Sequence, residues 1–596
     1  MARNLDNGRA VGVTRWPRSA TSVVAVALAL GAGCRDDATP ADDMGTTEST
    51  ETDAVDESGE PAEDTGEPGT NPVYLEPTEH LTRISMALRG VRPQPDELRR
   101  VAEDPEALPE LVDTYLEDPR FGDIVRDLHN DGLLSLVDFF LFPAGFQPKG
   151  AVDDVDAYRL NRSVTEAPLR LIEYVVMNDR PYSEIVTADY TLADGNVAAV
   201  WGLDHDGGTA WTTTQWPDER ANAGILSDPW IYQRYGSTLG NANRGRANAI
   251  SRALLCYDFL SRDIEVDASV NLADPDEVAN AVVENAACAS CHQALDPLAS
   301  FFKDWSPTYV PADVDYPHDP YVTDVFPNSG VVMRDAGYFG QAGEGLADLG
   351  QLIAEDPRFS LCAAQRFYAY FHQIDREAVP LEVAAQLQQD FLGQGMSAKA
   401  LARAIVLDDE FRISHMEAQS ERDPVGVKKA RPTQLALLFD DLTGFRWQTD
   451  LSEFELAPVD LMADSFLGYN VLLGGIDSLF VTRPSHTYGA TASLVLRNLA
   501  REAAHHVVDA DFDAADAGSR HLLTLVSEGD TDEAVVRQQM AELYLRIMSR
   551  IIEPDDPAID ETYALFQAAL EHSGEVRRAW KITLTALLQD VDVAYY

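Results

Sequence analysis

The sequence contains few basic residues for its length. Its 596 residues include 46 Lys and Arg against 99 Asp and Glu, which gives a formal net charge of −53 at pH 7. This balance argues against nucleic acid as a partner, because binding a phosphate backbone depends on Lys and Arg side chains that displace counterions. It also argues against anionic membrane surfaces as a binding platform. The charge favours solubility or salt tolerance, with a cationic partner as the alternative.

Several common site motifs are also missing. The chain has no Gly-rich phosphate loop, no G-x-S-x-G and no H-E-x-x-H, the patterns of nucleotide-binding, hydrolase and zinc-protease sites. The run from Asp509 to Asp513 starts like a calcium loop, but Ala514 and Arg520 stand where that loop requires Gly and an acid. The sequence therefore offers no motif for these kinds of site.

The one apolar run near the N-terminus is too short to stay in a bilayer as a spanning helix. Residues 21–32 form this run; four Arg residues precede it, and small residues stand directly before Cys34. The pattern predicts a signal peptide over residues 1–33. It resembles a bacterial lipoprotein cleavage site with Cys34 as the lipidated first residue. Leu30 lies four places before Cys34 rather than three, so ordinary secretion stays open as the alternative.

The segment that follows has almost no apolar residues. Residues 34–74 consist largely of Asp, Glu, Thr, Ser, Pro and Gly. Such a segment cannot bury enough surface to offset chain entropy, so we predict an acidic disordered tether. Signal, lipidated Cys34 and tether together predict attachment to the bacterial cell envelope through the lipid anchor only, at the outer membrane, the cell surface or the periplasmic face.

The rest of the chain has the composition of a globular protein. Hydrophobic residues make up 45% of the sequence and charged residues 24%, so most of the chain can bury a core. Leu81, Ile84 and Leu88 recur at helical spacing, and similar runs continue to the C-terminus. We expect a mainly α, multi-module helical protein.

One pentapeptide occurs twice. Glu-Asp-Pro-Arg-Phe stands at 117–121 and again at 355–359, each time after an apolar helical run. Pro cannot continue a helix interior and Asp caps the next helix, so we predict a degenerate helix-pair repeat. The alternative is that acidic turns simply recur in an acidic chain.

Residues 190–245 differ from their surroundings. Trp201, Trp211, Trp216 and Trp230 lie there among Gly, Thr and Asn. We expect long irregular aromatic loops, which are often functional or packed over something.

There are only five Cys, and two of them belong to the motif with the clearest chemistry. Cys288-Ala289-Ser290-Cys291-His292 reads C-x-x-C-H, in which two thiols can bond the vinyl groups of one covalent haem c and His292 can ligate its iron. The alternatives are a Cys288–Cys291 disulfide and a zinc site. No second C-x-x-C lies nearby to complete the ligands of a zinc ion.

The sixth iron ligand is left open by the sequence. Met333, 41 residues after His292, is the first candidate among the side chains; His318 and His372 are others, and the position can also lack a protein ligand. Met would favour electron transfer, whereas an open position would favour peroxide or small-ligand chemistry. The leftover Cys256 and Cys362 lie in apolar runs, and we expect a disulfide between them, with two buried free thiols as the alternative.

The run from Cys288 to Ala299 resembles the planctomycete cytochrome C-type surface proteins, which are also common in myxobacteria. Their pattern is C-x-x-C-H, three residues, Asp-Pro, an aliphatic residue and Gly; Asp296 and Pro297 match, and Ala299 replaces the Gly. Residues 170–190, 244–256 and 338–362 resemble the helical modules of that family. The resemblance implies haem and export but no substrate, and the single C-x-x-C-H does not extend it to conduction through several haems.

These features lead to one architecture and three hypotheses for function. We expect a helical N-terminal domain over 75–200, a haem-bearing domain over 201–420 and a helical C-terminal domain over 421–596. The first hypothesis is electron transfer with a redox partner protein or an extracellular enzyme. The second is a haem peroxidase or oxidase whose substrate cleft is lined by the aromatic loop at 201–230. The third is a surface scaffold in which the haem is structural.

Overall fold

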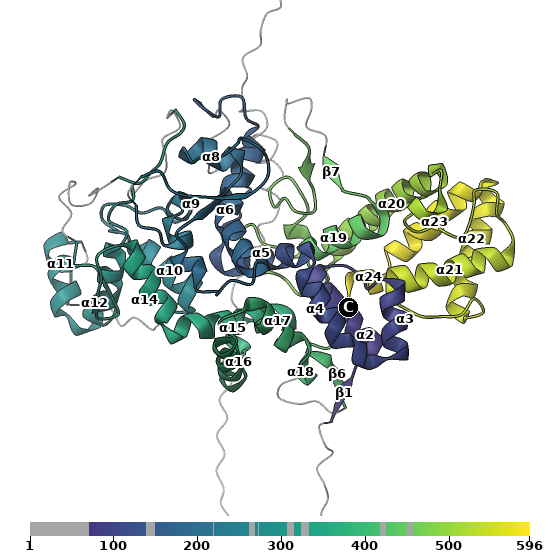
Figure 1. The fold of residues 1–596 in the computed structure, drawn as a ribbon, viewed down its shortest axis with the longest axis horizontal. Coiled ribbons are helices and arrows are strands. Elements are labelled where there is room, and N and C mark those ends of the chain that lie inside the picture. The colour runs from purple at the N-terminus through teal and green to yellow at the C-terminus, as the bar shows by residue number, and fades with distance from the viewer. Residues whose placement is uncertain are drawn as a thin grey trace, which may run out of the picture. The chain divides into compact units, whose positions relative to one another are not determined.

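The computed structural model describes residues 71–138, 149–218, 220–261, 269–271, 273–306, 315–322, 333–417, 425–449 and 457–596. The predicted signal, Cys34 and nearly all of the predicted tether lie outside these ranges. Within them the protein has 22 α-helices and four two-stranded antiparallel sheets (Figure 1). The prediction of a mainly α fold is confirmed. In the same ranges, no helix has both the length and the apolar character that crossing a membrane requires.

The first described segment forms a strand and four helices. These are β1 (Pro72–Tyr74), α2 (Pro77–Arg89), α3 (Pro95–Glu103), α4 (Leu108–Glu117) and α5 (Pro119–Leu133), with a 3-10 turn at Pro105–Ala107. Each α-helix has Pro at its first or second position, where the missing N–H costs no hydrogen bond. Short helices with sharp starts therefore follow directly from the Pro positions.

The middle of the chain alternates short and long elements. They are α6 (Ala157–Met177), α7 (Glu184–Thr187), β2 (Thr191–Ala193), α8 (Gly195–Trp201), β3 (Thr212–Thr214), a 3-10 turn at Gly224–Ser227, α9 (Pro229–Arg234), α10 (Arg244–Leu255), α11 (Pro275–Glu284) and α12 (Ala286–Ser300). The region expected to be aromatic loop thus contains several short elements, and β2 pairs with β3.

A second helical run follows the motif. It consists of β4 (Gly337–Tyr338), β5 (Gln341–Ala342), α14 (Leu346–Glu355), α15 (Pro357–His372), a 3-10 turn at Arg376–Ala378, α16 (Leu381–Gly393), α17 (Ala398–Val406), α18 (Asp409–Arg412) and β6 (Ile413–Met416). β4 pairs with β5, and β6 pairs with β1. The β1–β6 pair ties the first described residues to the end of this run.

The repeated pentapeptide builds the same junction at both sites. Asp118 caps α5 by accepting the Arg120 N–H at 2.9 Å, and Asp356 caps α15 by accepting the Arg358 N–H at 2.8 Å. In each copy the Pro that follows is the first helical residue. The junction is the local consequence of Asp as N-cap and Pro at the next position.

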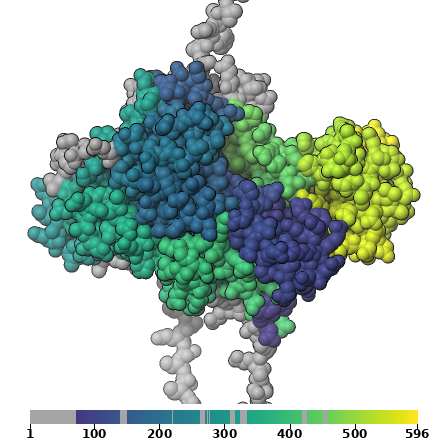
Figure 2. Space-filling model, viewed as in Figure 1, coloured from purple at the N-terminus to yellow at the C-terminus, as the bar shows by residue number. Residues whose placement is uncertain are grey.

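The C-terminal part is a helical bundle. Its elements are α19 (Pro432–Thr443), β7 (Gln448–Thr449), β8 (Val459–Asp460), 3-10 turns at Val471–Leu473 and Ala517–Ser519, α20 (Ala490–Asp513), α21 (Glu533–Met548), α22 (Pro557–Ser573), α23 (Val576–Leu588) and α24 (Val591–Ala594); β7 pairs with β8. In the space-filling view these yellow-green helices adjoin the purple N-terminal helices (Figure 2). Arg431 of this part pairs with Asp131 on α5 at 2.7 Å.

Buried apolar residues form two large clusters and one small one. The largest runs mainly from Leu81 to Phe411, and the second joins the helices from α19 to α24 with Met86 of α2. The third contains Trp201, Trp216 and Trp230, packed against α6 and α8. The clusters interlock along the sequence, so the domain borders near 200 and 420 stay predictions.

Candidate haem-attachment site

The C-x-x-C-H motif lies in the first two turns of α12. Asn285 separates this helix from α11, and its side-chain oxygen accepts the N–H groups of Ala287 at 3.0 Å and Cys288 at 3.4 Å. This cap starts α12 just before the motif. The helix pair α11–α12 therefore presents both cysteines from a regular backbone.

The two cysteines occupy neighbouring positions on one helical face. Cys288 and Cys291 are three residues apart, a spacing that brings side chains together on an α-helix. Both are free thiols and both are half-buried. The pair is thus available for two thioether bonds on the same side of α12.

His292 is oriented by a carboxylate one turn further along the same helix. Its Nδ1 lies 2.8 Å from Oδ1 of Asp296, and its side chain is 24% exposed. Because a carboxylate only accepts, this contact needs a proton on Nδ1, which in a neutral ring leaves the lone pair on Nε2. The contact thus favours the tautomer that a metal-binding Nε2 needs.

Asp296 is in turn held by two arginines. Arg244, at the start of α10, donates from Nε to Oδ1 at 2.7 Å and from Nη2 to Oδ2 at 3.1 Å. Arg334 Nε lies 3.7 Å from Oδ2. Burial alone would raise the pKa of Asp296, but the hydrogen bonds from His292 and Arg244 lower this pKa to about 2. The carboxylate is therefore ionised at neutral pH.

These donors fit a covalent haem c. Two free thiols one helical turn apart are followed by an imidazole whose second nitrogen is fixed by a carboxylate. Metal-bound histidines commonly donate their other N–H to such a group. In the described ranges, no cluster of three or more His, Cys, Asp or Glu side chains is placed to hold a metal ion.

α11 and the first turns of α12, which carry the motif, are weakly buried. In α11, Ala281 is the one described residue with a buried side chain, and Val283 is 61% exposed. In α12 the buried residues begin only at Leu295, after the motif. Apolar side chains beside the motif thus remain in contact with solvent.

The candidate sixth ligands lie in different surroundings. Met333 is half-buried, and its neighbour Arg334 donates to the Val282 carbonyl of α11 at 3.1 Å in addition to facing Asp296. The segment with Met333 therefore runs beside the motif. Its role as a ligand stays a prediction.

The two histidine candidates pack elsewhere. The backbone N–H of His318 donates to the Val200 carbonyl of α8 at 3.0 Å, and α8 is separated from α12 in Figure 1. His372 is buried in α15, where its ring stacks on Tyr368 at 3.9 Å and meets Phe411 edge-on at 5.4 Å. The ring of His372 is thus engaged in packing within α15, and the backbone of His318 is held by α8.

Cys256 and Cys362 are joined by a disulfide, with a Cα–Cα distance of 5.4 Å. Cys256 follows the last residue of α10, and Cys362 lies in α15. The disulfide therefore ties α10 to α15. α10 begins with Arg244, which binds Asp296 of α12. The α11–α12 pair lies inside the 106-residue loop that the disulfide closes.

The Trp side chains expected to line a cleft are mostly buried. Trp201, Trp216 and Trp230 are each less than 10% exposed. Trp230 donates its indole N–H to the Ser135 carbonyl at 2.9 Å, and the Arg220 guanidinium lies 4.3 Å from the ring centre of Trp216. These rings act as core, and their position gives no support to an aromatic substrate cleft.

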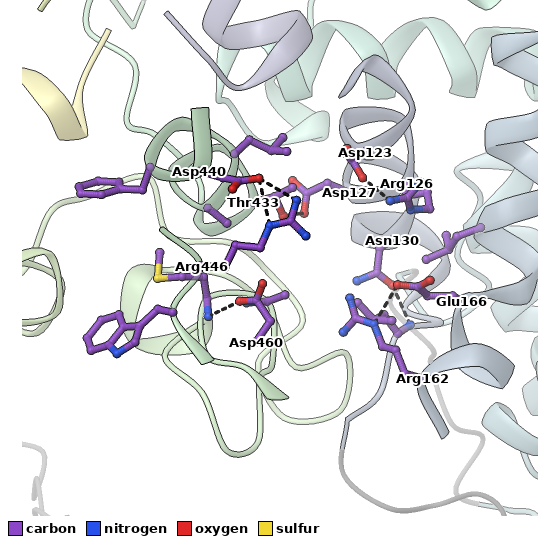
Figure 3. A pocket seen from close by; sticks show the side chains of 18 of the residues that line it. Asp123, Arg126, Asp127, Asn130, Arg162, Glu166, Thr433, Asp440, Arg446 and Asp460 are labelled. Atoms are coloured by element: carbon purple, nitrogen blue, oxygen red, sulfur yellow. Dashed lines mark hydrogen bonds and ion pairs between the residues drawn. The ribbon is translucent and has the colours of Figure 1, made fainter. Parts of the chain in front are cut away.

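A separate cleft of about 300 Å³ lies between α5 and α6 on one side and α19 with β7 and β8 on the other (Figure 3). Its charged side chains pair with one another: Arg446 with Asp440 at 2.7 Å, and Arg162 with Glu166 at 2.8 Å. None of its lining residues belongs to the motif. We assign it no function.

The role of the Asp296 carboxylate was not predicted from the sequence. The spacing of His292 and Asp296, four residues on one helix, was a usable signal for their pairing. Arg244 and Arg334 carried no such signal, because they come from segments 52 and 38 residues away from Asp296.

Comparisons of the chain with protein-family models, with curated proteins and with solved structures find no match.

Proposed function

We propose that this protein is an exported lipoprotein that carries one covalent haem c and transfers electrons. The observation that carries the proposal is the arrangement on α12: two free thiols three residues apart, followed by His292 with Nδ1 bonded to Asp296 at 2.8 Å. Cys288 and Cys291 would form the thioether bonds, and His292 would ligate iron through Nε2.

The bound haem would supply a one-electron couple, and the chain would supply position and electrostatics. The Asn285 cap holds the start of α12. Asp296 fixes the His292 ring, and Arg244 fixes Asp296. Because the motif is only half-buried, a haem attached there would be accessible to a partner protein.

Electron transfer has more support than the two other hypotheses. The segment with Met333 runs beside the motif, and Met at the sixth position favours electron transfer. A peroxidase or oxidase has less support, because three of the Trp side chains expected to line its cleft are buried. A scaffold with structural haem predicts no dependence of partner binding on redox state, which distinguishes it.

Covalent attachment is tested on the full chain produced with c-type maturation outside the cytoplasm. After extraction with acid and organic solvent, we expect one haem per chain by the pyridine haemochrome assay. Cys288→Ser/Cys291→Ser should lose this haem. Cys256→Ser/Cys362→Ser is the matched control and should keep it. Colourless protein after extraction would refute the proposal.

The class of function is tested on the haem-loaded protein. We expect a reversible redox couple and a low-spin ferric spectrum that cyanide leaves unchanged. Met333→Ala should convert the ferric haem to a high-spin form, whereas Met416→Ala and His318→Ala should not. Turnover of peroxide with a reducing dye, lost in His292→Ala, would instead favour the enzyme.

The anchor is a separate part of the proposal, because Cys34 lies outside the described residues. We propose a lipid on Cys34, followed by a tether that ends before strand β1 at Pro72. Metabolic labelling with palmitate in a bacterial host should mark the wild type and not Cys34→Ser. Labelling that survives in Cys34→Ser would refute lipidation at this residue and leave the haem site untouched.

A further inference from the structure

An ion-pair network centred on the buried Asp296 holds the imidazole of His292 at its Nδ1. Oδ1 of Asp296 accepts from two donors at once, His292 Nδ1 at 2.8 Å and Arg244 Nε at 2.7 Å. Arg244 Nη2 binds the second oxygen at 3.1 Å, and Arg334 approaches that oxygen at 3.7 Å. Asp296 is 8% exposed, so little water competes for the carboxylate.

This geometry has an electronic consequence for the ligand. A carboxylate that accepts the Nδ1 proton makes the imidazole a stronger donor through Nε2. A stronger donor stabilises the more highly charged ferric iron over the ferrous form. Because Asp296 is mostly buried, its charge is screened less than a surface carboxylate would be.

Arg244 opposes this effect in part. Its guanidinium shares Oδ1 with His292 and binds both carboxylate oxygens. A cation on the same carboxylate reduces the negative charge that the imidazole senses. Since Arg244 starts α10, which the Cys256–Cys362 bond ties to α15, its position is set by the helical core rather than by the motif segment.

We propose that Asp296 is a positioning residue that holds His292 in its iron-binding tautomer and lowers the reduction potential of the haem, and that Arg244 limits this lowering. The inference rests on the proposed function, since it concerns the same site. A centre with a lowered potential releases its electron more readily.

The test measures the reduction potential of haem-loaded variants. Asp296→Asn keeps an oxygen that can accept from Nδ1 but removes the charge, and Asp296→Leu removes both. We expect each to shift the ferric–ferrous equilibrium at least tenfold toward ferrous iron, which is 59 mV for one electron. Asp296→Glu should restore part of the wild-type potential. Arg244→Gln should shift the potential in the opposite direction.

Two controls separate the possible outcomes. Glu284→Gln removes an exposed carboxylate at the end of α11, so it reports the effect of charge without contact to His292 and should change the equilibrium less than twofold. Covalent haem content is measured in every sample. If the wild type lacks haem, the proposed function fails. If haem is full and Asp296→Asn and Asp296→Leu match Glu284→Gln, the role of Asp296 fails alone.

Discussion

The α11–α12 pair and the C-terminal bundle are both built from helices, but their helices bury very different numbers of side chains. α20 buries ten residues along its length, among them Val495, Leu499 and Val507. α11 buries only Ala281 among its described residues. The bundle therefore has a large protein core of its own, whereas α11 and the start of α12 contribute almost nothing to a protein core.

The difference teaches where a cofactor would contribute to stability. A helix whose apolar side is covered by other helices gains its stability from that packing. A helix pair that lacks such cover stays at the low end of local stability unless a bound group supplies contacts. If haem c is attached, we expect it to order α11 and the start of α12 and to leave the bundle unchanged.

The largest expected effect comes from truncating the bundle core. Trp580 is fully buried in α23, and its ring centre lies 4.8 Å from that of Phe566. Trp580→Ala should lower the free energy of unfolding by about 3–5 kcal/mol, because it leaves a large cavity. Val283→Ala shortens an exposed side chain of α11 and should cost about 0.5 kcal/mol or less. Urea denaturation followed by circular dichroism compares them; equal losses would contradict the contrast.

The disulfide should matter to the part that holds the motif more than to the bundle. Cys256→Ser/Cys362→Ser opens a loop of 106 residues that contains α11 and α12 and excludes α19 to α24. We expect a loss of about 2–4 kcal/mol. Thermal unfolding with and without reductant measures it.

In haem-loaded protein, Cys288 and Cys291 would be thioethers, so the Cys256–Cys362 bond would be the disulfide that the reductant opens, while haem reduction would be common to both proteins. The wild type should therefore lose more stability on reduction than Cys256→Ser/Cys362→Ser. The unfolding temperature of the C-terminal bundle should change little. A reductant effect of equal size in that double variant would point to another target.

Removing the cofactor should loosen the motif pair alone. In Cys288→Ser/Cys291→Ser/His292→Ala we expect amides of α11 to exchange roughly 100-fold faster than in haem-loaded wild type. This corresponds to a free energy of local opening that is lower by about 2.8 kcal/mol. Amides of α21, which buries nine residues in the bundle, should exchange at the same rate in both. Hydrogen exchange with mass spectrometry measures both helices in one sample. Unchanged protection of α11 would show that haem does not order it.

The sequence allowed much of the fold to be predicted, for local reasons. Helical spacing of apolar residues and the Asp-Pro junctions depend on residues a few positions apart, so the mainly α character was accessible. The environment of the four Trp residues was not. Gly, Thr and Asn around them suggested open loops, but Trp230 is buried because its indole packs on α6 and reaches the carbonyl of Ser135, 95 residues away.

The candidate site divides in the same way. Cys288, Cys291 and His292 are visible as a contiguous pattern, and the pairing of His292 with Asp296 follows from helical spacing. The contribution of Arg244 depends on how α10 packs against α12, and no local pattern encodes that. Ion pairs between residues far apart in the sequence cannot be predicted from helical periodicity or from short motifs.

The smallest expected effect comes from the caps of two matched helices. Asn285 caps α12, and Asp532 caps α21 by accepting the N–H groups of Ala534 at 3.1 Å and Val535 at 3.2 Å. Asn285→Ala and Asp532→Ala should each cost about 1 kcal/mol of helix stability. Because α21 unfolds with the bundle core, Asp532→Ala should lower the midpoint of urea denaturation. Because the start of α12 can open by itself, Asn285→Ala should leave that midpoint in place and speed amide exchange in the first turn of α12. Equal midpoint shifts in the two variants would mean that the motif pair is as firmly packed as the bundle.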